Sequence, residues 1–107
     1  MFRKIAIAAT TATLLGSAAA ANEFGILDGV EEGAQFYDVP LATLDAAGMV
    51  QIEDQDGTVL GSADAAAGPN TDLRIEFETP VMAGGELVAK IIVDGEVVDM
   101  EMIEVDG

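Results

Sequence analysis

The 107-residue chain contains no cysteine, no histidine and no tryptophan. Without cysteine it can form no disulfide, and without cysteine or histidine it lacks the ligands that most zinc sites require. Nucleophilic catalysis needs an activated nucleophile, and the usual activating base, histidine, is absent. The chain has so many acidic residues that pairs of carboxylates are expected by chance, and a pair of carboxylates is what glycoside hydrolysis requires. We therefore retain a small hydrolase, but only as the third function class. We expect a non-enzymatic protein.

Basic side chains are also scarce, and half of them lie at the extreme N-terminus. Arg3 and Lys4 precede a short apolar run and then a series of small residues. This order is typical of a secretory signal peptide, and the apolar run is shorter than the roughly 20 residues that span a membrane. We predict a signal peptide over residues 1–21, cleaved after Ala20 or Ala21. The product would be periplasmic or secreted, with no membrane insertion after cleavage.

The predicted mature domain, residues 22–107, is strongly acidic. It keeps all 20 acidic side chains and only two basic ones, Arg74 and Lys90, so its formal net charge is −18. Such a charge repels nucleic acid and anionic membranes and favours a soluble monomer. The expected partner is therefore an unknown protein or cell-surface component.

Hydrophobic periodicity predicts an all-β fold for this domain. Residues 71–79, TDLRIEFET, alternate between apolar and charged side chains, as in a half-buried strand. Residues 86–94, ELVAKIIVD, carry apolar groups on both faces, as in a central strand. The Asp94-Gly95 pair that follows is a strong hairpin signal. Short strands with turns every 8 to 12 residues predict a small antiparallel immunoglobulin-like β-sandwich of six or seven strands.

Three segments are less regular. Pro40 divides residues 34–45, which predicts a strand that is bent or interrupted at a sheet edge. The alanine-rich residues 63–70 are expected to be irregular, with one helical turn as an alternative. Residues 22–33 are expected to form either a loose arm or a short first strand.

The acidic segment IEDQDGTVL, residues 52–60, raises the question of a calcium loop. An EF-hand with Gly57 at its sixth position would place Ile52 and Ala63 where oxygen ligands are required, so the segment is not an EF-hand. An Asp-rich turn ending in glycine instead predicts a β-hairpin. A weak Ca²⁺ or other cation site is the alternative. Its metal ligands would be Glu53, Asp54 and Asp56.

Four methionines of the mature domain have two interpretations. Met100 and Met102 fall on one face of a strand, and with Met49 and Met82 they could offer thioethers to Cu(I). The simpler interpretation is that methionines at strand spacing fill the core. No histidine or cysteine is present to complete a copper site, so we expect core packing.

The stretch MVQIEDQDGTVLGSADAAAGPNTDLRIEFETP followed by GGELVAKIIVD resembles the uncharacterised immunoglobulin-like repeat domain of secreted and surface proteins of halophilic archaea and some bacteria. The matching elements are Val50–Asp54, Val59–Ser62, Ala65–Gly68, Leu73–Phe77, Pro80 and Leu87–Asp94. The resemblance implies a β-sandwich located outside the cytoplasm, and no activity. Glu53 and the Ile91-Ile92 pair stand in regions where that family often carries histidines, so no metal role carries over. The leading function is thus an acidic binding or interaction module, and a cation-binding protein is the alternative.

Overall fold

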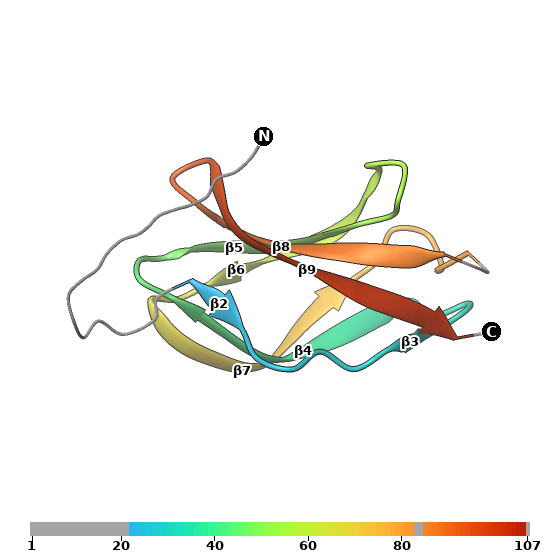
Figure 1. Cartoon of the computed structure of the whole chain (residues 1–107), viewed down its shortest axis with the longest axis horizontal. Coiled ribbons are helices and arrows are strands. Elements are labelled where there is room, and N and C mark those ends of the chain that lie inside the picture. The colour runs from blue at the N-terminus through green and yellow to red at the C-terminus, as the bar shows by residue number, and fades with distance from the viewer. Residues whose placement is uncertain (1–21, 83–84, 107) are drawn as a thin grey trace.

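The computed structural model describes residues 22–82 and 85–106, and these residues contain strands but no helix. The strands are β2 (Glu23–Phe24), β3 (Val30–Glu31), β4 (Phe36–Leu44), β5 (Gly48–Glu53), β6 (Val59–Ala65), β7 (Gly68–Glu76), β8 (Glu86–Val93) and β9 (Glu96–Asp106). They form a three-stranded sheet of order β2-β4-β7 and a five-stranded sheet of order β3-β9-β8-β5-β6. Figure 1 shows the two sheets as two layers. The predicted all-β, sandwich-like architecture is confirmed.

The hairpin between β8 and β9 forms at the Asp94-Gly95 pair, as the sequence predicts. Both residues have positive φ angles, 54° and 78°. This is the combination that a two-residue type I′ turn requires, and glycine adopts it without steric cost. The turn sets the register of the first pairs, in which Val93 pairs with Glu96 and Ile92 pairs with Val97, and a one-residue shift after Ile92 then gives the register in which Lys90 pairs with Met100 and Leu87 with Ile103.

The core lies between the sheets and consists of the side chains that point inward at every second position along the strands. Ile75 on β7 has no exposed surface, as its period-two pattern predicts, and the same is true of Val50, Ile52 and Ile91. Burying one such side chain stabilises the fold by about 1.5–3 kcal/mol relative to leaving it in water. Since the chain has no disulfide, this apolar burial is the main stabilising contribution.

Residues 22–33 contribute one short strand to each sheet. Strand β2 pairs antiparallel with β4, and β3 pairs in parallel with β9. The chain crosses between the layers after Phe24 without reversing direction, so it meets β9 in parallel (Figure 1). The expectation of a purely antiparallel fold is therefore wrong at this one pair. Hairpin signals could not reveal it, because parallel neighbours need no tight turn.

Two local expectations also need correction. Strand β4 runs through Pro40 without interruption, and it lies at an edge there, because β2 pairs with β4 only at Ala42 and Thr43. The registered pairs on either side of Pro40 leave Asp72 opposite it, and Asp72 has a φ of 52°. The neighbouring strand thus departs from regular geometry where proline supplies no N–H. Residues 63–70 hold no helical turn, because β6 ends at Ala65 and β7 begins at Gly68.

One side of the sandwich is closed where β6 approaches β7. The Glu78 N–H donates to the Leu60 carbonyl oxygen at 2.9 Å. A Cβ atom placed on Gly61 would lie 2.1 Å from the Glu76 carbonyl oxygen. Only glycine therefore permits the two sheets to meet here.

Candidate interaction surfaces

The predicted turn after β5 is a hairpin whose own aspartate holds it together. Asp54 Oδ1 accepts hydrogen bonds from the N–H groups of Asp56 and Thr58, both at 2.9 Å. Gly57 has a φ of 88°, in the left-handed region that glycine favours. The side chain of Asp54 thus caps its own turn, as short polar side chains commonly do.

The three predicted metal ligands make different contacts in the structure and do not converge on one point. Glu53 Oε2 lies 3.0 Å from Lys90 Nζ and accepts a second hydrogen bond from Gln51 Nε2 at 3.0 Å. Asp54 caps the turn, and Asp56 is exposed to solvent. Over residues 22–82 and 85–106, no group of three or more acidic, histidine or cysteine residues is placed to hold a metal ion. The geometry brings no cation site together at this turn.

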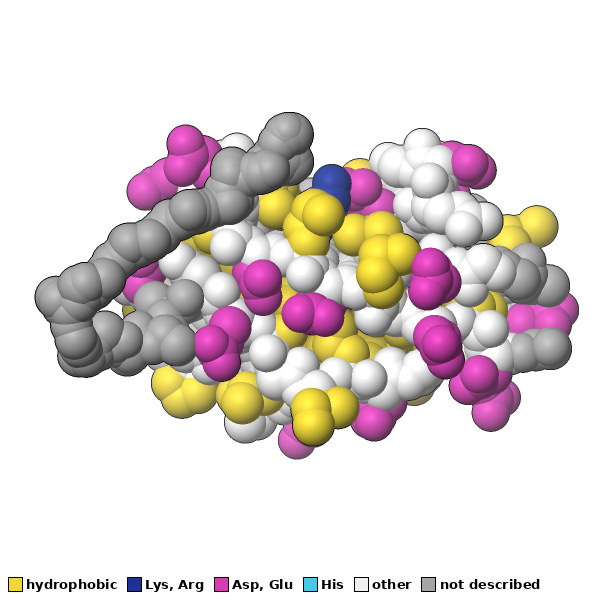
Figure 2. Space-filling view, viewed as in Figure 1, with side chains coloured by type: hydrophobic (Ala, Val, Ile, Leu, Met, Phe, Trp, Pro, Cys, Tyr) yellow, Lys and Arg dark blue, Asp and Glu magenta, His cyan; other side chains and the backbone are white. Residues whose placement is uncertain are grey.

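The side of the five-stranded sheet that points away from the core carries apolar and polar side chains, and most of the apolar ones lie on β8 and β9. We call this surface the outer face. Registered pairing places Ile92 between Val97 and Met49, and Val88 between Met102 and Glu53. The apolar members of the outer face, spread over four strands, are Met49, Val59, Val88, Ile92, Val97, Met100 and Met102. Figure 2 shows yellow and magenta side chains beside dark-blue atoms near the top centre of the view, with further acidic side chains in the middle and toward both ends.

The centre of the outer face carries no net charge, in contrast with the rest of the molecule. Its two ionised groups are Lys90 and Glu53, which neutralise each other and are only 23% and 13% exposed. Acidic residues stand at its border: Asp64 pairs with Met49 on one side, and Glu86 pairs with Glu104 at one end. Exposed apolar side chains that gather on one face of a protein often mark an interaction site.

The opposite side of the sandwich has a different character. On the three-stranded sheet, the Arg74 guanidinium donates to both carboxylate oxygens of Asp38 at 3.0 and 3.2 Å and lies over the Phe36 ring. The hydrogen bond from Arg74 lowers the pKa of Asp38 below its usual value. This ion pair is solvated, but the three-stranded sheet also exposes apolar surface, since Phe36 is 44% exposed.

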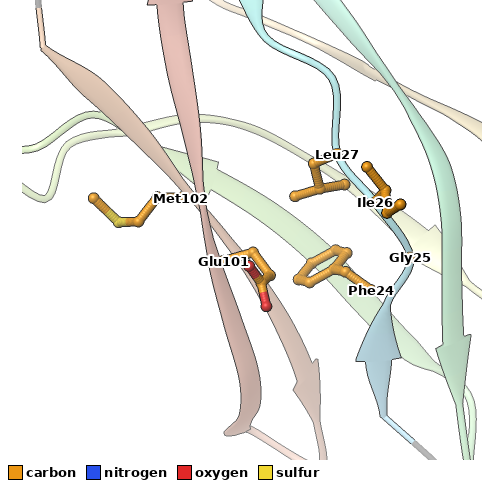
Figure 3. Close-up of a pocket in the computed structure, with 6 residues that line it drawn as sticks. All are labelled: Phe24, Gly25, Ile26, Leu27, Glu101 and Met102. Carbon is orange, nitrogen blue, oxygen red and sulfur yellow. The ribbon is translucent and has the colours of Figure 1, made fainter.

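A groove of about 500 Å³ lies beside β9, on the side away from β8. Its walls are Phe24, Gly25, Ile26 and Leu27 on the crossing segment and Glu101 and Met102 on β9. Figure 3 shows Glu101 on the side of β9 that faces Phe24, while Met102 points to the opposite side of the strand. The groove therefore adjoins the outer face but opens toward the gap between the two sheets.

Two partly buried hydrogen bonds hold the crossing segment in place. Asp99 Oδ2 accepts a hydrogen bond from the Phe24 N–H at 3.1 Å, and the Tyr37 hydroxyl donates to the Asp28 carbonyl oxygen. Burial raises the pKa of Asp99 despite this bond, and burial together with the nearby Asp28 carboxylate raises the pKa of Tyr37 to about 12. The first contact joins β2 of one sheet to β9 of the other, so the groove has a fixed wall.

The methionines are surface residues, contrary to the expectation of core packing. Met100 and Met102 are 48% and 51% exposed on the outer face, and Met82 is 80% exposed outside it. Strand β9 has apolar residues on both sides, so its periodicity does not show which side is buried. Its pairing with β8 settles this, because Ile103 pairs with the buried Leu87.

Comparison with known proteins adds no further identification. The sequence matches no family model, no curated protein and no solved structure. In the described part of the chain, no helix is long and apolar enough to cross a membrane.

Proposed function

We propose that the protein is an exported, non-enzymatic binding module that docks another protein on the outer face of its five-stranded sheet. One observation carries the proposal: a chain of formal net charge −16 exposes Val97, Met100 and Met102 together on one sheet face, whose central charges are paired as Lys90 and Glu53. Burial of apolar surface is the main favourable term in most protein association.

The acidic residues around the outer face determine which kind of partner protein can bind there. The acidic border of the outer face complements a protein whose own apolar patch is surrounded by lysine and arginine, and such complementarity speeds association and excludes wrong partners. A second copy of this chain brings the same high negative charge, so its approach is opposed except at high salt. The partner that fits is a basic-rimmed protein surface, and the module itself is a monomer.

The immunoglobulin-like class belongs to the same proposal. The neighbours β4-β7 in one sheet and β9-β8-β5 in the other follow the B-E and G-F-C neighbours of an immunoglobulin sandwich. The chain departs from antibody domains in having neither the cysteine pair nor the tryptophan. Apolar packing alone then takes the place of the inter-sheet bridge.

Export and the lack of catalysis are supported by composition. Residues 1–21, outside the described part of the chain, have the order of charge, apolar run and small residues of a signal peptide. Cell fractionation followed by intact-mass measurement tests export: the protein recovered outside the cytoplasmic membrane should lack residues 1–20 or 1–21. A full-length protein in the cytoplasm would contradict it.

Docking is tested by photo-crosslinking from two matched positions. A photoreactive amino acid replaces Met100 on the outer face or, as the control, Met82, which is more exposed and lies elsewhere. We expect one specific product from position 100 and none from position 82. Identical products, or none, from both positions would contradict docking on this face.

Affinity for the captured protein provides the second measurement. The double substitution M100E/M102E should weaken binding at least tenfold, since it buries two unpaired charges in the contact. The matched control Met82→Glu adds the same kind of charge outside the outer face and should leave the affinity unchanged. Equal effects of the two variants would show that charge alone, and not the outer face, governs binding.

A further inference from the structure

As far as the structure describes the chain, one edge of strand β9 has no strand paired with it along most of its length. The crossing segment nevertheless lies against this edge at Gly29, next to the Glu104 carbonyl oxygen. It pairs with β8 from Glu96 to Glu104, but its pairing with β3 covers only Val105 and Asp106. Among the described residues, no strand pairs with the other edge of β9 before Val105. The groove lined by Phe24, Leu27 and Glu101 runs beside this part of the edge.

The main-chain groups that face the groove can be assigned from the hydrogen bonds at the end of the strand. The Asp106 carbonyl oxygen accepts from the Glu32 N–H on the β3 side, whereas the Val105 N–H donates to the Gly85 carbonyl oxygen on the β8 side. Alternate residues of a strand direct their N–H and C=O groups to the same side. Met100 and Met102 therefore direct their main-chain groups toward the groove.

We propose that the groove beside β9 is a second binding site, which accepts an extended peptide segment of a partner protein as an added strand with a basic side chain beside Glu101. Main-chain hydrogen bonds to the Met100 carbonyl oxygen and to the N–H and carbonyl oxygen of Met102 would hold the segment, in the manner of strand addition to an exposed sheet edge, while the Met100 N–H stays bonded to the Asp99 carboxylate.

The choice of a basic segment follows from the side chains that line the groove. Glu101 points into it beside the Phe24 ring, and the half-buried Asp99 lies two residues earlier on the same side of β9. A lysine or arginine can lay its aliphatic part against Phe24 and Leu27 while its charged end reaches Glu101. An acidic segment would meet like charge instead.

The same carboxylate protects the unpaired edge from self-association. An inward-pointing charge on an edge strand is a common device against edge-to-edge pairing of identical sheets. If β9 of one copy paired with β9 of another, two acidic strands would lie side by side. The high net charge of each copy would also oppose their approach. The unpaired edge of β9 therefore disfavours pairing with a second copy of β9 and favours pairing with a basic strand.

This site goes beyond the proposed docking on the outer face, and its test does not require the natural partner. The probe is a synthetic ten-residue peptide of alternating valine and lysine. One comparison peptide carries glutamate in place of lysine, and a second keeps the lysines but has N-methyl groups on alternate peptide nitrogens. N-methylation removes main-chain donors while it leaves the side chains in place.

The first readout is amide hydrogen exchange of the full mature protein, measured by nuclear magnetic resonance. We expect the lysine peptide to slow exchange at the Met102 amide, because the Met100 amide already donates to the Asp99 carboxylate. The N-methylated peptide should bind at least roughly tenfold more weakly, because the added strand loses two or three hydrogen bonds. Unchanged exchange at the Met102 amide, or equal binding of the N-methylated and unmodified peptides, would overturn strand addition.

The second readout separates this site from the outer face. Methyl-labelled methionines report both surfaces, since Met49 lies on β5, two strands away from the groove. The peptide should shift the Met102 signal and leave those of Met49 and Met82 in place. A shift of Met49 without amide protection on β9 would place the peptide on the outer face, which overturns the groove but not the proposed function.

Charge selection is tested with a conservative variant. Glu101→Gln should weaken the lysine peptide about twofold to fivefold, as expected for a partly exposed ion pair. The matched control Glu78→Gln removes one exposed carboxylate distant from β9 and should have no effect beyond general screening. Equal binding of the glutamate and lysine peptides to the unmodified protein would refute the basic preference.

Discussion

Lys90 Nζ lies 3.0 Å from Glu53 Oε2 at the centre of the outer face of the five-stranded sheet. The two residues belong to neighbouring strands but are not directly opposite: Lys90 pairs with Gln51, and Glu53 pairs with Val88. The diagonal contact therefore joins β5 to β8 through side chains as well as through the main chain. With Gln51 as a third member, it leaves the centre of the outer face uncharged.

Removal of one member of this pair should destabilise the protein more than removal of both. Lys90→Met leaves the sparsely exposed Glu53 carboxylate with only Gln51, and we expect a loss of about 1–3 kcal/mol, less than for a fully buried pair. The double variant K90M/E53M should recover much of this loss, because two apolar side chains suit the surrounding valines and methionines. Urea unfolding of the four proteins of the cycle measures both quantities.

The exposed pair of the other sheet is the natural control for this cycle. Arg74 and Asp38 are bonded at similar distances but are largely solvated, with side chains 53% and 41% exposed. Arg74→Met should therefore change the urea midpoint much less than Lys90→Met does. If Lys90→Met and Arg74→Met change the urea midpoint equally, the apolar surroundings of Lys90 do not affect the free energy of unfolding.

The hydrogen bond from Phe24 to Asp99 gives a pH-dependent prediction. Burial raises the folded-state pKa of Asp99, so protonation favours the folded state. The cost of keeping Asp99 ionised is absent below its unfolded pKa and complete above its folded pKa. Asp99→Asn keeps an acceptor for the Phe24 N–H without the buried charge, so this variant should be at least as stable as the unmodified protein at pH 7.

Thermal unfolding between pH 7 and pH 4 measures this effect as a difference between the two proteins. The advantage of Asp99→Asn should shrink as the pH falls, because protonation removes the same charge from the unmodified protein. The deficit of Asp99→Ala should instead grow as the pH falls, toward about 1–3 kcal/mol, since this variant leaves the Phe24 N–H without its partner while protonation stabilises the unmodified protein. A constant gap between the aspartate and asparagine proteins would contradict the raised pKa.

Gly61 should tolerate no side chain. Gly61→Ala would place Cβ 2.1 Å from the Glu76 carbonyl oxygen, so the closed side of the sandwich must open or bend. We expect a loss of about 2–4 kcal/mol, at or above the upper range for overpacking. Gly33→Ala is the comparison: it has space for Cβ but a φ of 85°, so it should lose about 1–2 kcal/mol through backbone strain alone. Equal losses of stability in the two variants would show that the β6–β7 contact can adjust to a Cβ atom at position 61.

The local parts of this fold could be predicted from the sequence, and the non-local parts could not. Alternation identified Ile75 as a core residue, and the Asp94-Gly95 pair identified the last hairpin, because both signals act within a few residues. Strands β2 and β3 are two residues each, too short to show a period. Their existence depends on contacts with β4 and β9, which are distant in sequence.

The same distinction explains the candidate sites. The carboxylate of Glu53 looked like a possible metal ligand because its neighbours in sequence are acidic, yet its partner Lys90 is 37 positions away and is brought near only by the β5–β8 register. Met102 was expected in the core because the sequence does not show which side of β9 faces inward. The unpaired edge of β9 is likewise a property of the sheet order and not of any motif.

The turn after β5 allows the cation hypothesis to be tested separately from turn capping. Asp54→Asn keeps an oxygen acceptor for the Asp56 and Thr58 N–H groups and should preserve stability, whereas Asp54→Ala should lose about 1 kcal/mol. Calcium chloride should raise the melting temperature no more than sodium chloride at equal ionic strength, because its benefit is the screening of a highly acidic surface. A specific calcium effect that Asp54→Asn removes would reveal a site assembled only when the ion is bound, since a ligand stabilises the state that holds it. Capping and ion binding are thus distinguished by one pair of variants in two salts.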